Sequence, residues 1–478
     1  MNKYYFTIGL EIHAELKTKT KMFCSCKNDP DEKKPNINIC PVCMAHPGAL
    51  PVINKKAIEN VVKVGLALDG DIADFTEFDR KNYFYPDIPK GYQISQYKYP
   101  IVKGGSLADM KITRIHLEED TANNKHFSAD DGYSLIDFNR AGIPLMELVT
   151  EPHSFEDGKN AAKIAADFAK EFQLLLLYLD ISEANMEKGE MRVEANISVS
   201  IDKNKLGTKV EVKNLNSFKS VERAILYEFD RIIGLLEEDK DIIQETRGWD
   251  ENKQNTFSQR KKESSHDYRY FPDPDLPKMK LHEAFNLDEM KKVLPELPEE
   301  KRKRYKDDFG IKDEDIEVYI NDPKLGVNFS AIAEILADKE KIKLASNYIT
   351  SDYLGIKKNS AEDSLPQLPE SINFAELINL VSENTISSRV AKDILAMIVI
   401  KDESPKKIAI EKNLLQKNDE GELKEIIEKI INENSSVVTI YKGGKENALM
   451  SLVGKIIKES NGSANPQVVI KLLKEFIK

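Results

Sequence analysis

Apolar and polar residues alternate strictly in one stretch of the chain, and this pattern predicts a half-buried β-strand. Residues 193–201 place apolar side chains on one face and polar side chains on the other. Residues 209–213 repeat the pattern, and the β-prone residues 4–13 predict a further strand. A sheet of such strands has one apolar face against the core and one polar face toward solvent.

Apolar residues at every third or fourth position predict two helices. The first spans Ser154–Asp180, with Ser154 as its N-cap. The second runs from Ser217 to about Glu238 and also begins at a possible cap. Strands and helices mixed in this way predict an α+β body with a mixed or antiparallel sheet.

The pattern changes near residue 293 and marks a domain boundary. Residues 294–298, Leu-Pro-Glu-Leu-Pro, predict a linker, after which helical periodicity dominates. Pro405 marks a further boundary before a last small helical unit. The 478 residues exceed what one compact core needs. We therefore expect three domains, at 1–292, 293–407 and 408–478.

Composition places the chain among globular proteins, with 41% hydrophobic and 32% charged residues. No apolar run approaches the roughly 18 residues that a membrane span needs, and the first residues lack the apolar region of a signal peptide. We therefore expect a cytoplasmic protein with no membrane partner.

The formal charge of −11 argues against a surface covered with nucleic-acid contacts, and no DNA partner is expected. From Tyr441 onward, however, the sequence contains seven lysines and only three glutamates. This mildly basic end is either a docking surface for a polyanion or a set of ordinary solvated helix faces.

Four cysteines lie within twenty residues, at Cys24, Cys26, Cys40 and Cys43. In a reducing compartment, two such close pairs are typical of a tetrahedral Zn²⁺ site with four thiolate ligands. The one-residue gap between Cys24 and Cys26 is shorter than the usual two. Ordinary free cysteines remain the alternative.

Carboxylates and histidines recur on predicted strands. Glu11 and His13 are two residues apart and would share a strand face, as a divalent-cation site needs, although surface pairs of this kind are common. His116, Glu118 and Asp120 would share another face, where a cation would relieve their repulsion; a solvated acidic turn is the alternative.

Two further segments carry polar residues of the same kinds. Glu147 and Glu151 follow Arg140, which is either a structural counter-ion or a phosphate clamp. Lys213, Asn214 and Asn216 precede a predicted helix start, where an anion could bind, although plain capping by Ser217 explains the segment equally well. No P-loop or kinase motif occurs, so any ATP site must be built from scattered acids and bases.

Aromatic and basic residues are interleaved in residues 80–99 and 266–277. Such segments suit an unpaired RNA end, whose bases stack on aromatic rings while its phosphates meet Lys or Arg. Tyrosines packed under proline-rich loops would give the same pattern.

Seven short sequence motifs along the chain together resemble those of the B subunits of bacterial-type aspartyl/glutamyl-tRNA(Asn/Gln) amidotransferases, the GatB/GatE family. They are residues 9–13 (Gly-Leu-Glu-Ile-His), 47–51, 80–86, 116–120, 213–217, 244–247 and 267–272. Asn465-Pro466 and Leu472-Leu473 resemble the family's tail domain. The resemblance covers nearly the full chain.

This resemblance implies a cradle domain with an ATP-dependent kinase site, a helical domain and a small YqeY-like tail domain. It implies an ATP- and Mg²⁺-dependent carbon–nitrogen ligase with glutamine as amido donor. The substrate would be misacylated Glu-tRNA(Gln), Asp-tRNA(Asn) or both. The partners would be an amidase subunit and a small third subunit, in a heterotrimer. A noncatalytic tRNA-binding scaffold of the same assembly is the alternative.

The match of motifs also suggests roles for individual residues. Glu11, His13 and Glu119 are assigned to Mg²⁺, with Glu118 less firmly, and Glu147 and Glu151 to a second ion or to ammonia passage. The phosphate partners would be Lys81, Lys90, Arg140, Lys213, Asn214 and Asn216, and the tRNA 3′ end would meet Tyr83, Tyr85 and Arg269. The zinc would be structural. Gln467 stands where the family usually carries Lys, which removes one expected phosphate contact.

Overall fold

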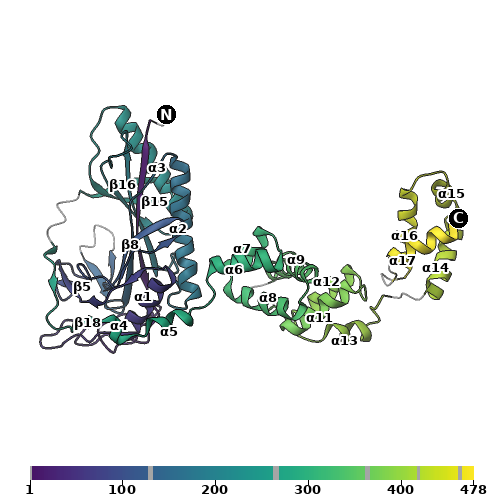
Figure 1. The fold of residues 1–478 in the computed structure, drawn as a ribbon, viewed down its shortest axis with the longest axis horizontal. Helices are drawn as coiled ribbons and strands as arrows, with labels where there is room; N and C mark the ends of the chain where they lie inside the picture. Colours follow the sequence, from purple (N-terminus) through teal and green to yellow (C-terminus); the bar gives the residue numbers. More distant parts are fainter. Residues whose placement is uncertain are drawn as a thin grey trace. The chain divides into compact units, whose positions relative to one another are not determined.

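The computed structural model describes residues 3–126, 133–261, 268–360, 367–416, 420–460, 464 and 466–477. The chain divides into two compact units, Met1–Pro298 and Glu299–Lys478. The first combines sheets and helices and the described part of the second is helical (Figure 1). This confirms the predicted α+β fold class, with a sheet domain followed by a helical region.

An eleven-stranded sheet forms the frame of the first unit. Its order is β16-β15-β14-β13-β1-β11-β8-β6-β2, with β12 paired to β1 and β7 to β8. All of these pairs are antiparallel except β14 with β15. The strands are β1 (Tyr5–Glu15), β2 (Asp71–Ile72), β6 (Val102–Lys103), β7 (Ser106–Leu107), β8 (Met110–Glu119), β11 (Pro144–Thr150), β12 (His153–Phe155), β13 (Met191–Ser200), β14 (Val210–Leu215), β15 (Glu245–Asp250) and β16 (Asn255–Lys261).

Among the described residues of this unit, three smaller sheets and five helices complete the fold. The sheets pair β17 (Phe271–Pro272) with β4 (Asp79–Asn82) and β5 (Tyr92–Ser95), β10 (Ser134–Asp137) with β9 (Asn123–His126), and β18 (Met279–Lys280) with β3 (Phe75–Thr76). The helices are α1 (Lys55–Ala67), α2 (Gly158–Tyr178), α3 (Phe218–Glu237), α4 (Leu281–Ala284) and α5 (Leu287–Lys292).

The alternation in β1 and β13 decides which face of the large sheet meets the core. Ile8, Leu10 and Ile12 are fully buried, and the apolar residues of β13 lie beside them in register. Helices α2 and α3 pack on this apolar face (Figure 1). The opposite face carries the charged side chains, as predicted, but part of it is covered. There β5 packs on β8, and the Ser95 hydroxyl donates to Glu118.

Local signals predicted one helix start correctly and missed the other. The Ser217 hydroxyl caps α3 by accepting from the Ser220 amide, as predicted. Helix α2 begins at Gly158 with Asp157 as its N-cap. The predicted cap, Ser154, is wrong because β12 pairs with β1 there, and the Ser154 hydroxyl bonds to Thr7 instead.

The described residues of the second unit form α-helices and two short π-helical turns. The elements are α6 (Pro298–Arg304), η2 (Tyr305–Phe309), α7 (Asp313–Asn321), α8 (Pro323–Leu336), α9 (Lys339–Asn347), η3 (Tyr348–Tyr353), α10 (Leu354–Asn359), α11 (Ser371–Ser382), α12 (Ser388–Ile398), α13 (Pro405–Glu411), α14 (Glu420–Glu433), α15 (Ser435–Lys442), α16 (Asn447–Glu459) and α17 (Pro466–Ile477). Helices α14, α16 and α17 share a core of their own.

The predicted boundary at 407/408 falls inside α13. Ile408 and Ala409 are buried there, and α13 packs on α11 and α12. A cut that spares this packing ends at Gln416, whose amide donates to the Thr385 carbonyl. The three predicted domains otherwise stay predictions.

Candidate functional site

Strand register gathers acids and histidines from distant parts of the chain on the polar face of the large sheet. His13 of β1 is paired with Glu147 of β11, which is paired in turn with His116 of β8. Glu11 is paired with Glu194 of β13. Because alternate residues of a strand share a face, Glu118 joins His116 on this side.

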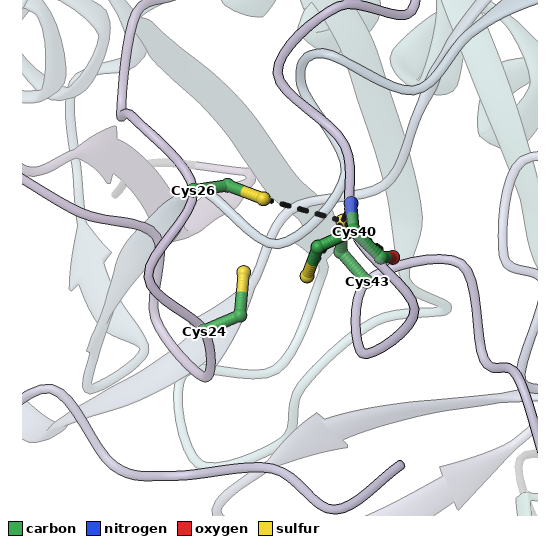
Figure 2. A group of neighbouring side chains, drawn as sticks. All are labelled: Cys24, Cys26, Cys40 and Cys43. Carbon is green, nitrogen blue, oxygen red and sulfur yellow. Dashed lines mark hydrogen bonds between the residues drawn. The ribbon is translucent and has the colours of Figure 1, made fainter.

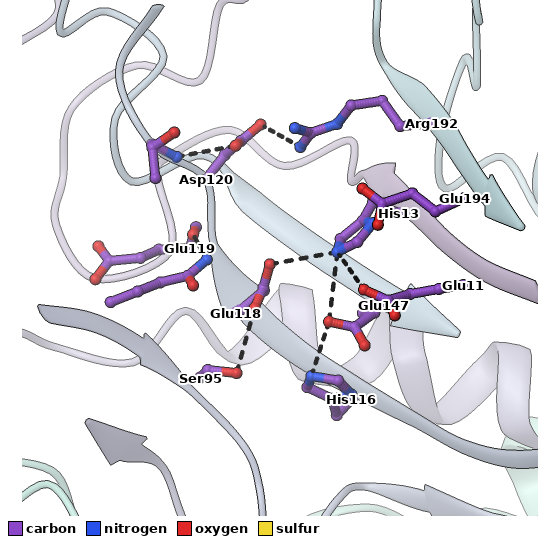
Figure 3. A network of polar contacts seen from close by, with 12 residues as sticks. Glu11, His13, Ser95, His116, Glu118, Glu119, Asp120, Glu147, Arg192 and Glu194 are labelled. Carbon is purple, nitrogen blue, oxygen red and sulfur yellow. Dashed lines mark hydrogen bonds and ion pairs between the residues drawn. The ribbon is translucent and has the colours of Figure 1, made fainter. Parts of the chain in front are cut away.

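We call the group of Glu11, His13, His116, Glu118, Glu147 and Glu194 the acidic cluster. Its side chains lie close to one another (Figure 3). His13 Nε2 is 3.4 Å from Glu147 Oε2, 3.8 Å from Glu118 Oε1 and 3.9 Å from Glu11 Oε1. His116 Nε2 is also 3.4 Å from Glu147 Oε2. Glu147 therefore stands between the two histidines.

Burial and crowding shift the ionisation of the cluster. Burial and the carboxylates of Glu147 and Glu194 raise the pKa of Glu11 to about 7. Burial lowers the pKa of His13, but Glu147 and Glu118 outweigh it and raise that pKa to about 9. Burial alone would raise the pKa of Glu147, yet His116 and His13 hold it well below its usual range. Arg114 and Lys213 each contact one of the carboxylates, and a divalent cation would balance the negative charge that remains.

Three sets of ligand atoms in the cluster lie close enough together to hold a metal ion, each within 4.8 Å of one another. They are Glu11 with His13 and Glu147, His116 with Glu118 and Glu147, and Glu11 with Glu194 and Glu211. Glu211 was not among the residues predicted from the sequence. Only its place in the alternating segment 209–213 could have signalled it.

The structure separates Glu119 from the acidic cluster. Glu119 follows Glu118 in β8 and therefore points to the other face. Lys90 Nζ lies 2.6 Å from Glu119 Oε1, and the Ile94 amide donates to the same carboxylate. The geometry therefore favours Glu118 over Glu119 as a metal ligand, and it pairs Lys90 with a protein carboxylate.

Glu151 lies outside the cluster as well. It follows the end of β11 and its side chain is exposed. Its predicted role in a second ion site or in ammonia passage has no support from its position.

Lys81 is a predicted phosphate partner whose charge interacts with two carboxylates of the cluster. Burial lowers its pKa, but Glu118, Tyr270 and Glu147 outweigh burial and raise that pKa. Its ammonium lies over the Tyr268 ring, 5.2 Å from the centroid. It makes no ion pair within 4.0 Å among the described residues, so it remains a cation available to an anionic ligand.

The other predicted phosphate partners are either paired or exposed. Lys213 Nζ lies 2.8 Å from Glu194 Oε2. Asn214, in a left-handed conformation with φ of 66°, and Asn216 are both exposed. Arg140 contacts Asp120 at 2.6 Å and Glu15 at 3.0 Å, which favours the structural counter-ion among the two interpretations of this arginine.

The aromatic residues predicted to meet RNA lie around the small three-stranded sheet. Tyr83 contacts Tyr268 edge to face, with ring centroids 6.3 Å apart. Tyr85 and Arg269 are exposed. Residues 266 and 267 of this segment lie outside the described residues.

The four cysteines form one group, as their spacing predicts (Figure 2). Cys43 Sγ lies 3.8 Å from Cys40 Sγ and 4.0 Å from Cys26 Sγ. Four thiolates around Zn²⁺ at about 2.3 Å would lie about 3.8 Å apart, so the group fits this ion. A hydrogen bond from Cys24 lowers the pKa of Cys43 to about 5, and the same contact raises the pKa of Cys24. Burial raises the pKa of Cys26 to about 12, so without an ion the thiolate is favoured at Cys43 and not at Cys24 or Cys26.

Within the described residues, none of the helices has the length and apolar character to cross a membrane.

Comparison with known proteins gives full-length matches. Residues 6–286 match the family described as GatB/GatE catalytic domain, and residues 330–477 the family described as GatB domain. The aspartyl/glutamyl-tRNA(Asn/Gln) amidotransferase B subunit of Caldanaerobacter subterraneus subsp. tengcongensis is 42% identical over 485 residues, 99% of both chains. Its namesakes from Crocosphaera subtropica and Thermotoga maritima are each 41% identical, over 99% of this chain and 98% and 99% of theirs. The chain therefore belongs to the family of aspartyl/glutamyl-tRNA(Asn/Gln) amidotransferase B subunits.

Proposed function

We propose that the chain uses ATP to phosphorylate the side-chain carboxylate of Glu-tRNA(Gln), Asp-tRNA(Asn) or both. A carboxylate oxygen attacks the γ-phosphorus, the bond to the β–γ bridging oxygen breaks, and ADP leaves. Ammonia then attacks the acyl carbon, loses a proton, and displaces inorganic phosphate. The names of the relatives support the substrates, and the acidic cluster supports the phosphoryl chemistry.

The observation that carries this proposal is the convergence of Glu11, His13, Glu118 and Glu147 from three strands. The charge of Lys81 interacts with Glu118 and Glu147 of this group. Three of these four residues are carboxylates, the donors that Mg²⁺ prefers, and all four lie close together. A bound Mg²⁺ would neutralise triphosphate charge. Lys81 attracts the transferred phosphoryl group, and Tyr83 and Tyr85 hold the tRNA 3′ end beside it.

A noncatalytic tRNA-binding scaffold is the second candidate. Such a scaffold gains nothing from the cluster, because crowded buried carboxylates are unfavourable without a cation. The catalytic proposal also includes the predicted partners, an amidase subunit that frees ammonia from glutamine and a small third subunit, in a cytoplasmic heterotrimer.

The test is to purify the chain with its amidase partner and measure ATP cleavage with and without misacylated tRNA. We expect cleavage only when misacylated tRNA is present. Separate assays with Glu-tRNA(Gln) and with Asp-tRNA(Asn) show which substrate is used. Cleavage at the same rate with uncharged tRNA would argue against carboxylate activation.

We propose that the four cysteines bind one structural Zn²⁺. Protein prepared without chelator is expected to contain about one zinc per chain by metal analysis, because the four thiolates complete a tetrahedral site. Cys43→Ser should lower the zinc content to less than about half. Met44→Leu, a substitution in the same loop that spares the thiolates, should leave the content unchanged. Wild-type protein without zinc would contradict the proposal.

We also propose that the tail binds the tRNA body through phosphates. A chain that ends at Gln416 should bind tRNA about tenfold more weakly and with a shallower salt dependence, because the tail lysines no longer neutralise phosphates. Filter binding across a salt series measures both changes, and circular dichroism checks that the first unit stays folded. Unchanged affinity would show that the tail makes no contribution.

A further inference from the structure

Lys21 is a buried cation that has no carboxylate beside it. The residue is 0% exposed, and its Nζ donates to the Phe138 carbonyl at 3.0 Å. Among the described residues, no Asp or Glu oxygen lies within 4.0 Å of this ammonium. Lys90, by contrast, is paired with Glu119. An ammonium removed from water is unfavourable without an opposing charge, and the Phe138 carbonyl offers only a partial one, so a nearby anion would stabilise Lys21.

The four cysteines lie next to Lys21 and could supply that anion. The Lys21 amide donates to the Cys26 carbonyl at 2.9 Å. The Lys21 stem and the Cys43 side chain both border the space above Gly142, where a methyl group would lie 3.6 Å from Lys21 Cδ and 3.8 Å from Cys43 Cβ. The Lys21 stem and one of the four cysteines therefore border the same small space.

The charge of a metal-loaded group complements that of Lys21. Four thiolates around one Zn²⁺ leave a net charge of about −2, which is itself unfavourable in a buried place unless a cation is near. The partners that surround metal ligands tune the affinity for the ion. Lys21 supplies a positive charge that is held in place by the Phe138 carbonyl.

We infer that the Lys21 ammonium is the counter-charge of the four-cysteine metal centre and slows the release of its ion. This inference rests on the zinc site proposed above. It attributes the slow release of the ion to the charge of Lys21, and not to the packing of its stem or to its hydrogen bond with Phe138.

Three variants of the full chain separate these contributions. Lys21→Met removes the charge and the hydrogen bond while it keeps most of the volume, and Lys21→Gln removes the charge but keeps a donor. Lys27→Met is the matched control, because Lys27 lies between the cysteine pairs but is exposed and paired with Asp29. The measurements are the rate of zinc transfer to a chromogenic chelator and the melting temperature with and without zinc.

Both Lys21 variants are expected to release zinc about tenfold faster than the wild type, whereas Lys27→Met should match the wild type. The metal-free Lys21→Met protein should melt no lower than the metal-free wild type, because it no longer buries an uncompensated charge. The stabilisation that zinc provides should accordingly shrink in both Lys21 variants.

Two results would overturn the inference. One is a wild-type zinc release rate in Lys21→Gln, which would assign any effect of Lys21→Met to the hydrogen bond. The other is an equal fall in the melting temperatures of zinc-loaded and metal-free Lys21→Met, which would indicate a packing role alone. Lys21→Gln carries the test if Lys21→Met does not fold. Absence of zinc from the wild type is a separate outcome that rejects the metal site itself.

Discussion

Replacing Glu147 with glutamine is expected to lower tRNA-dependent ATP cleavage about 1000-fold while leaving tRNA affinity within twofold. Glu147 is shared by two of the three possible ligand sets and contacts both His13 and His116 at 3.4 Å. The amide has the same shape but lacks the charge that a metal ion needs. The expected loss therefore lies in the chemical step and not in substrate binding.

The Glu147→Gln variant should still fold. Glutamine keeps the volume and the β11 backbone pairs, which do not depend on the side chain. His13 owes its raised pKa largely to Glu147 and can lose its proton once that charge is gone, so the variant need not bury an unpaired cation. Circular dichroism and the melting temperature check this point.

The control for Glu147→Gln is Glu187→Gln, the same substitution at an exposed loop position. It should cleave ATP at the wild-type rate. Single-turnover measurement of ADP formed from ATP in the presence of Glu-tRNA(Gln) or Asp-tRNA(Asn) reports the phosphoryl transfer directly. Retention of more than about a tenth of the wild-type rate by Glu147→Gln would remove the acidic cluster from the mechanism.

The two-residue period of a β-strand predicted which side chains of this cluster share a face. The period of two placed Glu11 with His13 and His116 with Glu118, and the structure has both pairs on the polar face of the large sheet. The motif match instead favoured Glu119, whose carboxylate points away and is held by Lys90. The alternation of side chains between the two faces follows from the backbone of one strand. It can therefore be deduced without knowing which strands are neighbours.

The rest of the site depends on long-range pairing that a single sequence does not reveal. Glu194 and Glu211 reach Glu11 only because β13 lies between β1 and β14. That order joins segments nearly 200 residues apart, and no local pattern specifies it. The wrong prediction of the α2 N-cap also results from long-range pairing, because Ser154 lies in β12, which pairs with β1.

Replacing Glu228 with alanine is expected to destabilise the first unit by about 3–5 kcal/mol, the largest stability effect that we predict. Glu228 lies in α3 and is 0% exposed. Arg231 donates to both of its carboxylate oxygens at 2.7–3.0 Å, and Arg247 Nε lies 3.1 Å away. Thr256 also donates to it. The carboxylate thus joins α3 to β15 and β16.

Removing the Glu228 carboxylate leaves two guanidinium groups without their shared anion, and arginine cannot escape this cost by losing its proton. A loss of this size should lower the melting temperature by about 5–8 °C in a unit of this length. The matched control is Asp230→Ala, two residues along α3 at an exposed position, which should melt as the wild type does. Calorimetry and urea unfolding both measure the effect. Equal melting temperatures for Glu228→Ala and Asp230→Ala would mean that Arg231 and Arg247 find other partners, and that this network does not hold β15 and β16 to the helix.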